Sequence, residues 1–246
     1  MKTPDDWIVP DWPAPARVKS LITTRNGGAS TGAYATFNLG LRCGDDANAV
    51  NENRRQLRAL LPQDPRWLRQ VHGAHAVVAD DLEAVVEADA AVARRPDTVC
   101  AVLIADCMPI LLCDDDTQVV AIAHAGWRGL SSGVIENCVR AMEIDPKRVI
   151  AYLGPAIGPD AFEVGADVHD AFVACDAAAA TAFRPHREDK WLADLGLLAR
   201  QRLAGCGVKR VYGGRMCTYR DARRFYSYRR DRTTGRMAAL IWLAPR

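Results

Sequence analysis

Hydrophobic and polar positions along the chain predict strands alternating with helices. Short apolar runs with the length and flanks of strands cover residues 17–24, 99–105, 119–123, 148–153, 209–212 and 237–243. Apolar residues at helical spacing predict helices over residues 46–61, 131–142, 165–175 and 191–204. Apolar–polar alternation predicts two further strand-like segments at residues 67–73 and 225–230. Because the strict βαβ repeat of a Rossmann fold or barrel is missing, we predict a mixed α/β sandwich.

Composition limits the size and class of the protein. A chain of 246 residues with 49% hydrophobic residues can bury one sizeable core, so we expect a single domain over residues 1–246. The 32 basic and 30 acidic side chains nearly balance, so there is no strong field to attract nucleic acid. No apolar run approaches the ~20 residues of a membrane span, and the N-terminus carries acids and prolines where a signal peptide is apolar. We therefore expect a soluble cytoplasmic protein that binds neither nucleic acid nor membranes.

The eight cysteines are scattered along the chain. They lack the density of a disulfide-stapled secreted domain, so we expect most to be reduced and buried. No Cys-x-x-Cys pair is present, which excludes the usual closed structural zinc site with two cysteine knuckles. Any metal must therefore be bound by residues that are distant in sequence.

Three potential metal ligands stand at ends or breaks of predicted strands. His72 stands near the end of the segment 67–73. Cys107 interrupts the apolar run that extends from residue 99 to residue 113, and His124 directly follows the predicted strand 119–123. Zinc prefers imidazole and thiolate ligands, and catalytic zinc typically keeps three protein ligands with an open fourth position. Taken singly, each has a structural interpretation: Cys107 as a small buried hydrophobe in a hairpin break, His124 as a satisfied core histidine, and His72 as a surface residue.

Arginines are the candidates for binding an anionic substrate. Guanidinium matches phosphate in a bidentate fork, so the candidates are Arg25, Arg54, Arg128, Arg229 and Arg230. We single out Arg25 and Arg229, the latter within the aromatic–polar segment 225–230. The glycine-rich loop at residues 25–32 is not a nucleotide-triphosphate loop, because Ala33 and Tyr34 stand where Lys and Ser or Thr should follow. The remaining histidines are expected at the surface: His75, His169 and His186.

Six motifs in order resemble one known family. They are the segments 70–73 (Gln-Val-His-Gly), 105–109 (Ala-Asp-Cys-Met-Pro), 123–129 (Ala-His-Ala-Gly-Trp-Arg-Gly), 154–158 (Gly-Pro-Ala-Ile-Gly), 217–219 (Cys-Thr-Tyr) and 225–230 (Phe-Tyr-Ser-Tyr-Arg-Arg). Together they resemble the bacterial YfiH or YlmD-like family, whose members are labelled polyphenol oxidase or purine nucleoside phosphorylase. The resemblance extends from about residue 7 to residue 243. Arg42 departs from it, since relatives often carry His at that position.

The resemblance implies a fold, a metal and an activity. The implied fold is a single-domain multilayer sandwich of mixed sheets with flanking helices, and the implied metal ligands are His72, Cys107 and His124. The implied metal is zinc, with copper as the alternative. The implied activity is that of a cytoplasmic purine nucleoside phosphorylase acting on adenosine, inosine and methylthioadenosine, with adenosine deaminase activity in the same pocket. Its partners would be purine nucleosides and phosphate, and the protein would be a monomer or a small homo-oligomer.

Several other functions are also compatible with the sequence. Five histidines cannot supply the copper cluster of a multicopper laccase, but weak copper-dependent phenol oxidation is compatible with one copper in place of zinc. Deamination requires activated water and proton transfer, and because the signature of the nucleobase deaminases is absent we assign the proton transfer to Asp106. A metal-free hydrolase, such as a peptidoglycan-precursor editing enzyme, would use Cys107 as nucleophile and His124 as base. A third class of function, besides metal-dependent enzymes and metal-free hydrolases, is a non-enzymatic module that binds nucleosides.

Overall fold

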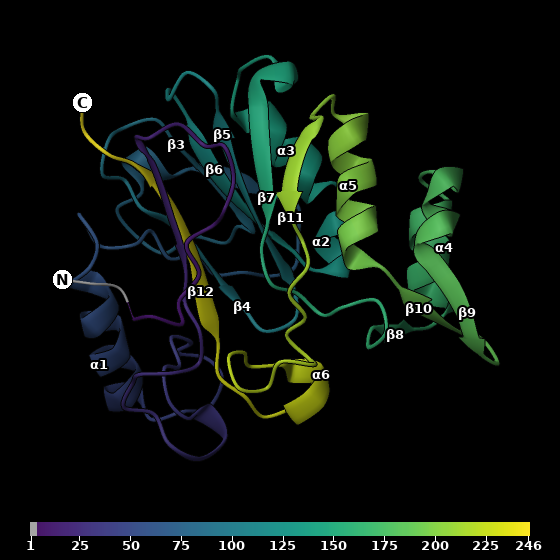
Figure 1. Cartoon of the computed structure of the whole chain (residues 1–246), viewed down its shortest axis with the longest axis horizontal. Coiled ribbons are helices and arrows are strands. Elements are labelled where there is room, and N and C mark those ends of the chain that lie inside the picture. The colour runs from purple at the N-terminus through teal and green to yellow at the C-terminus, as the bar shows by residue number, and fades with distance from the viewer. Residues whose placement is uncertain (1–3) are drawn as a thin grey trace.

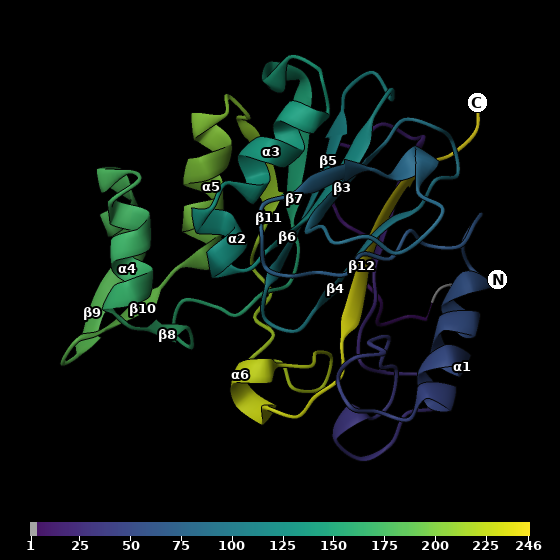
Figure 2. The same ribbon diagram turned by 180° about the vertical axis from the view of Figure 1, so that it is seen from behind.

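Two sheets packed face to face form the centre of the computed structural model, which describes residues 4–246. The larger sheet has six strands in the order β11 (Arg210–Gly213), β7 (Val149–Leu153), β5 (Met108–Asp114), β6 (Val120–Ala125), β3 (Ala90–Ala93) and β2 (Ala76–Val78). The smaller sheet is antiparallel, in the order β1 (Val18–Ile22), β12 (Met237–Leu243) and β4 (Cys100–Ile104). Both sheets lie in the middle of the molecule, with helices outside them (Figures 1 and 2).

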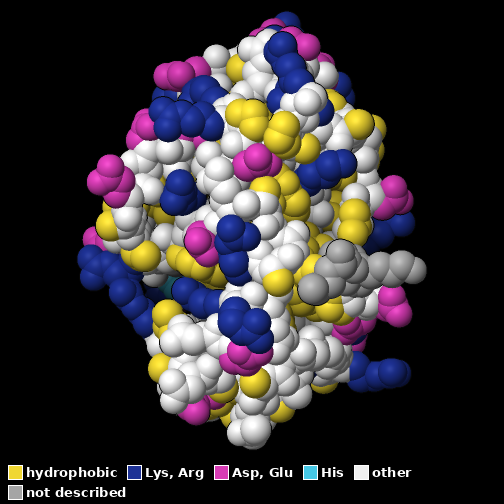
Figure 3. All heavy atoms as spheres, turned by 90° about the vertical axis from the view of Figure 1, so that its left-hand side faces the viewer, with side chains coloured by type: hydrophobic (Ala, Val, Ile, Leu, Met, Phe, Trp, Pro, Cys, Tyr) yellow, Lys and Arg dark blue, Asp and Glu magenta, His cyan; other side chains and the backbone are white. Residues whose placement is uncertain are grey.

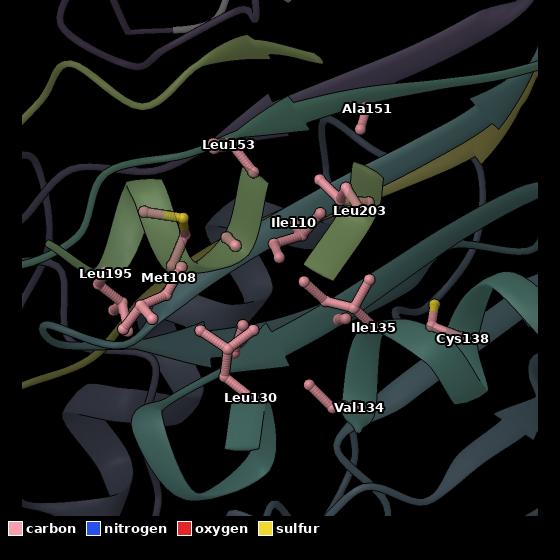
Figure 4. Close-up of a cluster of buried hydrophobic side chains, with 14 of the residues drawn as sticks. Met108, Ile110, Leu130, Val134, Ile135, Cys138, Ala151, Leu153, Leu195 and Leu203 are labelled. Atoms are coloured by element: carbon pink, nitrogen blue, oxygen red, sulfur yellow. The ribbon is translucent and has the colours of Figure 1, made fainter. Parts of the chain in front are cut away.

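Alternating side chains of the larger sheet reach two different cores. On β5, Ile110 and Leu112 pack into the core beneath the helices α3 (Val134–Ala141) and α5 (Leu195–Gly205), as Figure 4 shows for Ile110. Leu111, between them, packs on the opposite face with residues of the smaller sheet. A strand that is apolar at every position is therefore explained by burial on both of its faces.

The smaller sheet repeats this alternation and adds a further layer. Its second face carries Ala101 and Leu240, which pack with Leu57 of the helix α1 (Ala47–Arg58). α1 begins where the Asp46 side chain accepts a hydrogen bond from the backbone N–H of Asn48, as expected of an N-cap. The order of layers is thus helices, large sheet, small sheet and α1, so the prediction of a multilayer mixed α/β fold is confirmed.

A third, small sheet lies at one end of the molecule beside the helix α4 (Ala166–Val173) (Figures 1 and 2). Its antiparallel strands are β8 (Glu163–Val164), β10 (Lys190–Ala193) and β9 (Phe183–Arg187). Two short helices are α2 (Trp127–Ser131) and α6 (Tyr228–Asp231), and 3₁₀ turns cover Gly32–Tyr34, Ala79–Asp81, Pro146–Arg148 and Ala177–Ala182. Within residues 4–246, no helix combines the length and apolarity needed to cross a bilayer.

Two helix predictions were wrong in their extent. The helix predicted over residues 191–204 begins instead as strand β10, and α5 starts only after Asp194, whose side chain accepts a hydrogen bond from Leu197 N. The helix predicted over residues 131–142 begins only with α3 at Val134, because Gly133, whose φ of 93° favours glycine, separates it from α2, which ends at Ser131.

Two strand predictions were also wrong. Residues 67–73 form no named strand, because the Gln70 side chain takes both the N–H and the carbonyl of Leu103 on β4 in place of a backbone ladder. In the segment 225–230, the Ser227 side chain accepts from Arg230 N and starts the short helix α6. In both segments local side-chain bonds to the backbone override the apolar–polar alternation.

Candidate metal centre

Cys107 lies in the turn where the chain passes from one sheet to the other. β4 ends at Ile104 in the small sheet, and β5 begins at Met108 in the large one. Asp106 adopts a φ of 89° in this turn, a conformation that is uncommon outside glycine. Its carboxylate accepts hydrogen bonds from Thr218 Oγ1 at 2.6 Å and Arg229 N at 2.7 Å. The polar break in the apolar run is therefore a crossover between layers and not a hairpin turn.

His124 projects from the end of β6 and is oriented by a buried carboxylate. It is opposite Pro109 in the β5–β6 register and is almost fully buried. Its Nδ1 lies 2.8 Å from Oδ1 of Asp89, a residue with no exposed surface. This bond fixes the ring and leaves Nε2 to face a metal, an arrangement typical of histidine ligands.

Asp89 also positions the second histidine. Its carboxylate accepts hydrogen bonds from the backbone N–H groups of Val71 at 3.1 Å, His72 at 3.0 Å and Gly73 at 2.8 Å. His72 is thereby held with a φ of 59° although its side chain is exposed. The sequence-based prediction missed Asp89, and the available signal was a single carboxylate at the start of the small apolar run 88–93.

The three predicted ligands converge in the structure. One ligand atom from each of His72, Cys107 and His124 lies within 4.8 Å of the other two. The imidazole rings of the two histidines are 4.9 Å apart at their centroids, edge to face. A Cβ added to Gly126 would lie 2.7 Å from Cys107 Sγ, so glycine keeps this space open. One thiolate and two imidazoles fit zinc or copper, and the group has the spacing to bind a single ion.

Charges within the group favour a thiolate. Burial alone would raise the pKa of the Cys107 thiol, but the adjacent His124 and His72 lower it to about 6. Burial would likewise lower the pKa of His124, but Cys107 and Asp89 raise it to about 9. The pKa of Asp89 is lowered, because the hydrogen bonds from His124 and Gly73 outweigh the effect of its burial. Without a metal the group is thus poised as a thiolate beside an imidazolium.

The group opens onto a cavity of about 890 Å³ with a strongly basic lining. Seven arginines line it, at positions 42, 54, 69, 128, 229, 232 and 236, against three acids, Asp106, Glu163 and Asp167. Figure 3 shows one face of the molecule, on which Lys and Arg side chains gather around a hollow at the left of the view. The cavity has the volume of a small-molecule site and suits a substrate that carries negative charge.

The predicted substrate-binding and proton-transfer residues do not all reach this cavity. Asp106 and Arg229 line it. Arg25 lies elsewhere: its guanidinium donates to the carbonyls of Ala35 at 3.0 Å and Ala222 at 3.1 Å. The structure thus joins the ligand group with Asp106 and Arg229 and leaves Arg25 in a loop-bracing position.

The other three histidines stand apart from the ligand group. His75 is exposed and bonded to the Glu87 carbonyl, His169 stacks on Trp191, and His186 lies 3.5 Å from Glu163. In the part of the chain that the structure describes, His72, Cys107 and His124 form the single group spaced for a metal. A laccase-type copper cluster therefore has no ligands among these residues.

Comparison with known proteins gives full-length matches. Residues 19–244 match the family model described as "Multi-copper polyphenol oxidoreductase laccase". The protein named purine nucleoside phosphorylase YfiH of Escherichia coli is 51% identical over 239 residues, 96% of this chain and 98% of that protein. A Pseudomonas aeruginosa protein also named purine nucleoside phosphorylase is 50% identical over 238 residues, again 96% and 98% of the two chains.

Solved structures share the fold over nearly the whole chain. The crystal structure of the Neisseria meningitidis protein NMB0706 superposes with a TM-score of 0.95 at 50% identity, covering 98% of this chain and 100% of that one. YlmD from Geobacillus stearothermophilus superposes with a TM-score of 0.88 at 30% identity, covering 100% and 98%. The layers and the β4–β5 crossover therefore belong to a fold that is known from crystals.

Proposed function

We propose that this chain, which belongs to the family described as multi-copper polyphenol oxidoreductase laccase, is a zinc-dependent purine nucleoside phosphorylase. The observation that carries the proposal is 51% identity over almost the full length to a relative named for that activity. The basic cavity beside the ligand group supports it, since one substrate of a phosphorylase is an anion. Adenosine, inosine and methylthioadenosine are the proposed nucleosides.

In this proposal, zinc would be held by His72, Cys107 and His124, with Asp89 orienting both histidines. Bound there, zinc supplies a Lewis acid that polarises a substrate oxygen or water and stabilises negative charge. Because Gly126 has no side chain, its backbone can pack closely against Cys107 and His72, and a substrate can approach the group from the cavity that all three ligands line. The donor set also admits copper, and metal analysis of the purified protein distinguishes the two.

Phosphorolysis requires the cavity to hold phosphate and a nucleoside together, with the phosphate in line with the bond between C1′ of the ribose and the purine. A phosphate oxygen forms a bond to C1′ of the ribose while the bond from C1′ to the purine nitrogen breaks, and the base leaves with that electron pair and takes up a proton. Arginines of the lining offset the charge of the phosphate. Phe162 and Trp127 line the same cavity and provide aromatic surface for contact with a purine.

The predicted proton transfer by Asp106 meets a constraint. Its Oδ1 accepts a hydrogen bond from Thr218 and its Oδ2 accepts one from Arg229 N, so both oxygens are already engaged. Asp106 thus fixes α6 against the β4–β5 turn. We propose that it positions Arg229, and that proton transfer by this carboxylate needs one of the two bonds to open.

The test is a product analysis. Zinc-loaded protein is incubated with adenosine in the presence and absence of inorganic phosphate, and the products are separated by chromatography. Adenine that forms together with ribose 1-phosphate, and only when phosphate is present, is the expected result. Adenosine that stays intact under both conditions would rule out the proposal, and inosine formed without phosphate would reveal the deaminase activity proposed for the same pocket.

A cysteine hydrolase is the second candidate. The lowered pKa of Cys107 and the adjacent His124 are what a thiolate nucleophile and its base require. A thiolate bound to zinc cannot attack freely, so the two functions respond oppositely to a chelator. Activity lost on chelation and restored by zinc supports the phosphorylase, whereas activity that survives chelation and is blocked by alkylation of Cys107 supports the hydrolase.

A further inference from the structure

Three arginines gather at one end of the cavity around the loop at residues 39–42. The carbonyl of Leu39 accepts a hydrogen bond from Nε of Arg54 at 2.9 Å, and the N–H of Leu39 donates to the carbonyl of Arg236 at 3.0 Å. A Cβ on the next residue, Gly40, would lie 2.8 Å from Cγ of Arg236. Arg42 follows on the same loop and is exposed at the cavity wall. We call Arg42, Arg54 and Arg236 the arginine end.

The acids of the cavity lie on the β4–β5 turn and on the segment 163–167, and none of them is paired with the arginine end. Asp106 accepts from the backbone of Arg229, and the Arg229 guanidinium donates to the Glu163 carbonyl and lies 5.4 Å from the centroid of the Phe162 ring. Asp167 belongs to the same segment as Glu163. The segments that surround Arg229, together with the ring of Phe162, form the opposite wall of the cavity.

No carboxylate of residues 4–246 forms an ion pair with any member of the arginine end. Asp45, the acid nearest to them in sequence on this loop, is bonded to Ser30 and Asn38 instead. By contrast Arg69, on the same cavity wall, is paired with Glu87. The arginine end therefore carries positive charge that the described protein leaves uncompensated.

Arg54 is the member with the strongest need for a partner. It is half-buried, and its guanidinium lies over the Trp67 ring at 4.3 Å from the centroid. Burial lowers the pKa of Arg54 to about 10. Its Nε is fixed by Leu39, and no protein acceptor among residues 4–246 meets its two terminal nitrogens. A half-buried cation that is held in place by Leu39 and Trp67 and has terminal nitrogens left free by the described residues favours an anion that can complete its hydrogen bonds.

The arginine end adjoins the candidate metal centre through the small sheet. Met237 pairs with Ile104, so Arg236 comes next to Ala105, two residues before Cys107. The same turn contacts the opposite wall, where the carbonyl and carboxylate of Asp106 meet Ile157 and Arg229. The 105–107 turn thus lies between a basic end and an aromatic end of one cavity.

We propose that Arg54 and Arg236, with Arg42 at the rim, bind the phosphate co-substrate as a tetrahedral oxyanion, and that the purine lies at the opposite, aromatic end. The identity of the anion as a co-substrate rests on the proposed phosphorylase function. The subsite itself rests on the uncompensated arginines. This arrangement would place C1′ of the nucleoside between the two ends, beside the metal centre.

The experiment compares Arg54→Gln with Arg55→Gln in the full-length zinc-loaded protein. Arg55 is the adjacent residue on α1, is exposed and is paired with Glu52, so its replacement controls for loss of a helix charge. Affinity for inorganic phosphate is measured by calorimetry, and the KM for phosphate and for adenosine by product formation. Circular dichroism and zinc content verify that each variant is folded and loaded.

We expect Arg54→Gln to weaken phosphate binding and to raise the KM for phosphate by about tenfold or more, the loss typical of a charge-assisted hydrogen bond. The KM for adenosine should change less than about twofold on the same scale, and Arg55→Gln should behave like the wild type. Arg236→Gln is the second variant, and it should also weaken phosphate binding while it leaves the KM for adenosine nearly unchanged. If Arg54→Gln folds poorly, Arg54→Lys is the alternative. This variant keeps the positive charge but removes the bidentate guanidinium, and it should still weaken phosphate binding.

The outcomes separate this subsite from the proposed function. If the wild type cleaves adenosine with phosphate but neither Arg54→Gln nor Arg236→Gln alters phosphate affinity, the subsite is wrong and the function stands. If phosphate binds in an Arg54-dependent manner but no ribose 1-phosphate forms, the anion subsite stands and the phosphorylase proposal fails. A wild type that does not bind phosphate at millimolar concentration overturns the subsite.

Discussion

The metal centre and the arginine end belong to the same cavity but are completed in opposite ways. At the metal centre, the partners of the Asp89 carboxylate all belong to the protein: three backbone N–H groups and the His124 ring. These bonds hold both histidines in place. At the arginine end, Arg54 is held by Leu39 and Trp67 but has no carboxylate partner among the described residues. The first region is preorganised by the protein alone, whereas the second has a charge that only a ligand would neutralise. In our proposal, the first region therefore binds the cation and the second binds the anion.

The largest expected effect follows from removing the thiolate. Cys107→Ala should lower zinc binding below detection and nucleoside cleavage by at least about a hundredfold, because a site with two histidines loses its charged ligand. Zinc content by mass spectrometry and product formation measure both. Cys175→Ala is the control, since this cysteine is exposed and distant in sequence. Full activity in a zinc-free Cys107→Ala variant would contradict the metal centre itself.

The next effect tests whether Asp89 preorganises the centre. Asp89→Asn keeps the shape but removes the charge that orients His124 and accepts from three backbone groups, so zinc affinity should fall about 10- to 100-fold. Competition with a chromogenic chelator measures this affinity. Asp114→Asn is a matched control, because Asp114 is equally buried and accepts from the backbone of Gln118 and Val119. Equal loss of zinc affinity in both variants would reduce Asp89 to a general stabilising role.

A smaller effect on zinc affinity is expected when the space between Gly126 and the metal ligands is reduced. Gly126→Ala would bring a methyl group 2.7 Å from Cys107 Sγ and 3.1 Å from Cδ2 of His72, so one of them must move. Such overpacking typically costs about 1–3 kcal/mol, and we expect it to appear as weaker zinc binding more than as lower thermal stability. Gly205→Ala is the control, because nothing lies within 4 Å of a Cβ there. Unchanged zinc affinity in Gly126→Ala would show that the ligands have more room than their spacing indicates.

These tests also mark what the sequence could predict. The strands 99–105 and 237–243 were predictable because they are buried on both faces. Cys107 and His124 stood out at breaks or ends of such runs, but the three ligands together were predicted from the six ordered motifs. Asp89 was missed, because its role depends on three backbone N–H groups of a segment that is distant in sequence. The layer crossing at Cys107 was likewise hidden, since an apolar run does not reveal which sheet each half joins.

The arginines show a second limit of the same kind. Arg25 and Arg229 were chosen by type and context, but Arg25 braces a loop and Arg229 lies with the acids of the cavity. Arg54 was one of the five candidate arginines but was not singled out, because it lies on α1 beside the exposed Arg55 and the sequence does not show which of the two faces a cavity. What separates them is the packing of α1 against Trp67 and Leu39, which depends on the tertiary fold.

The smallest expected effect concerns the support of Arg54. Trp67→Leu removes the aromatic face beneath its guanidinium, a contact worth about 0.5–2 kcal/mol, so phosphate should bind a few-fold more weakly while zinc affinity is unchanged. Trp67→Phe keeps an aromatic ring and should recover most of the loss. Phosphate titration of both variants beside the wild type measures the difference. Weaker zinc binding in Trp67→Leu would mean that the two ends are mechanically coupled, whereas a selective loss of phosphate affinity would show that the arginine end is tuned independently of the metal centre.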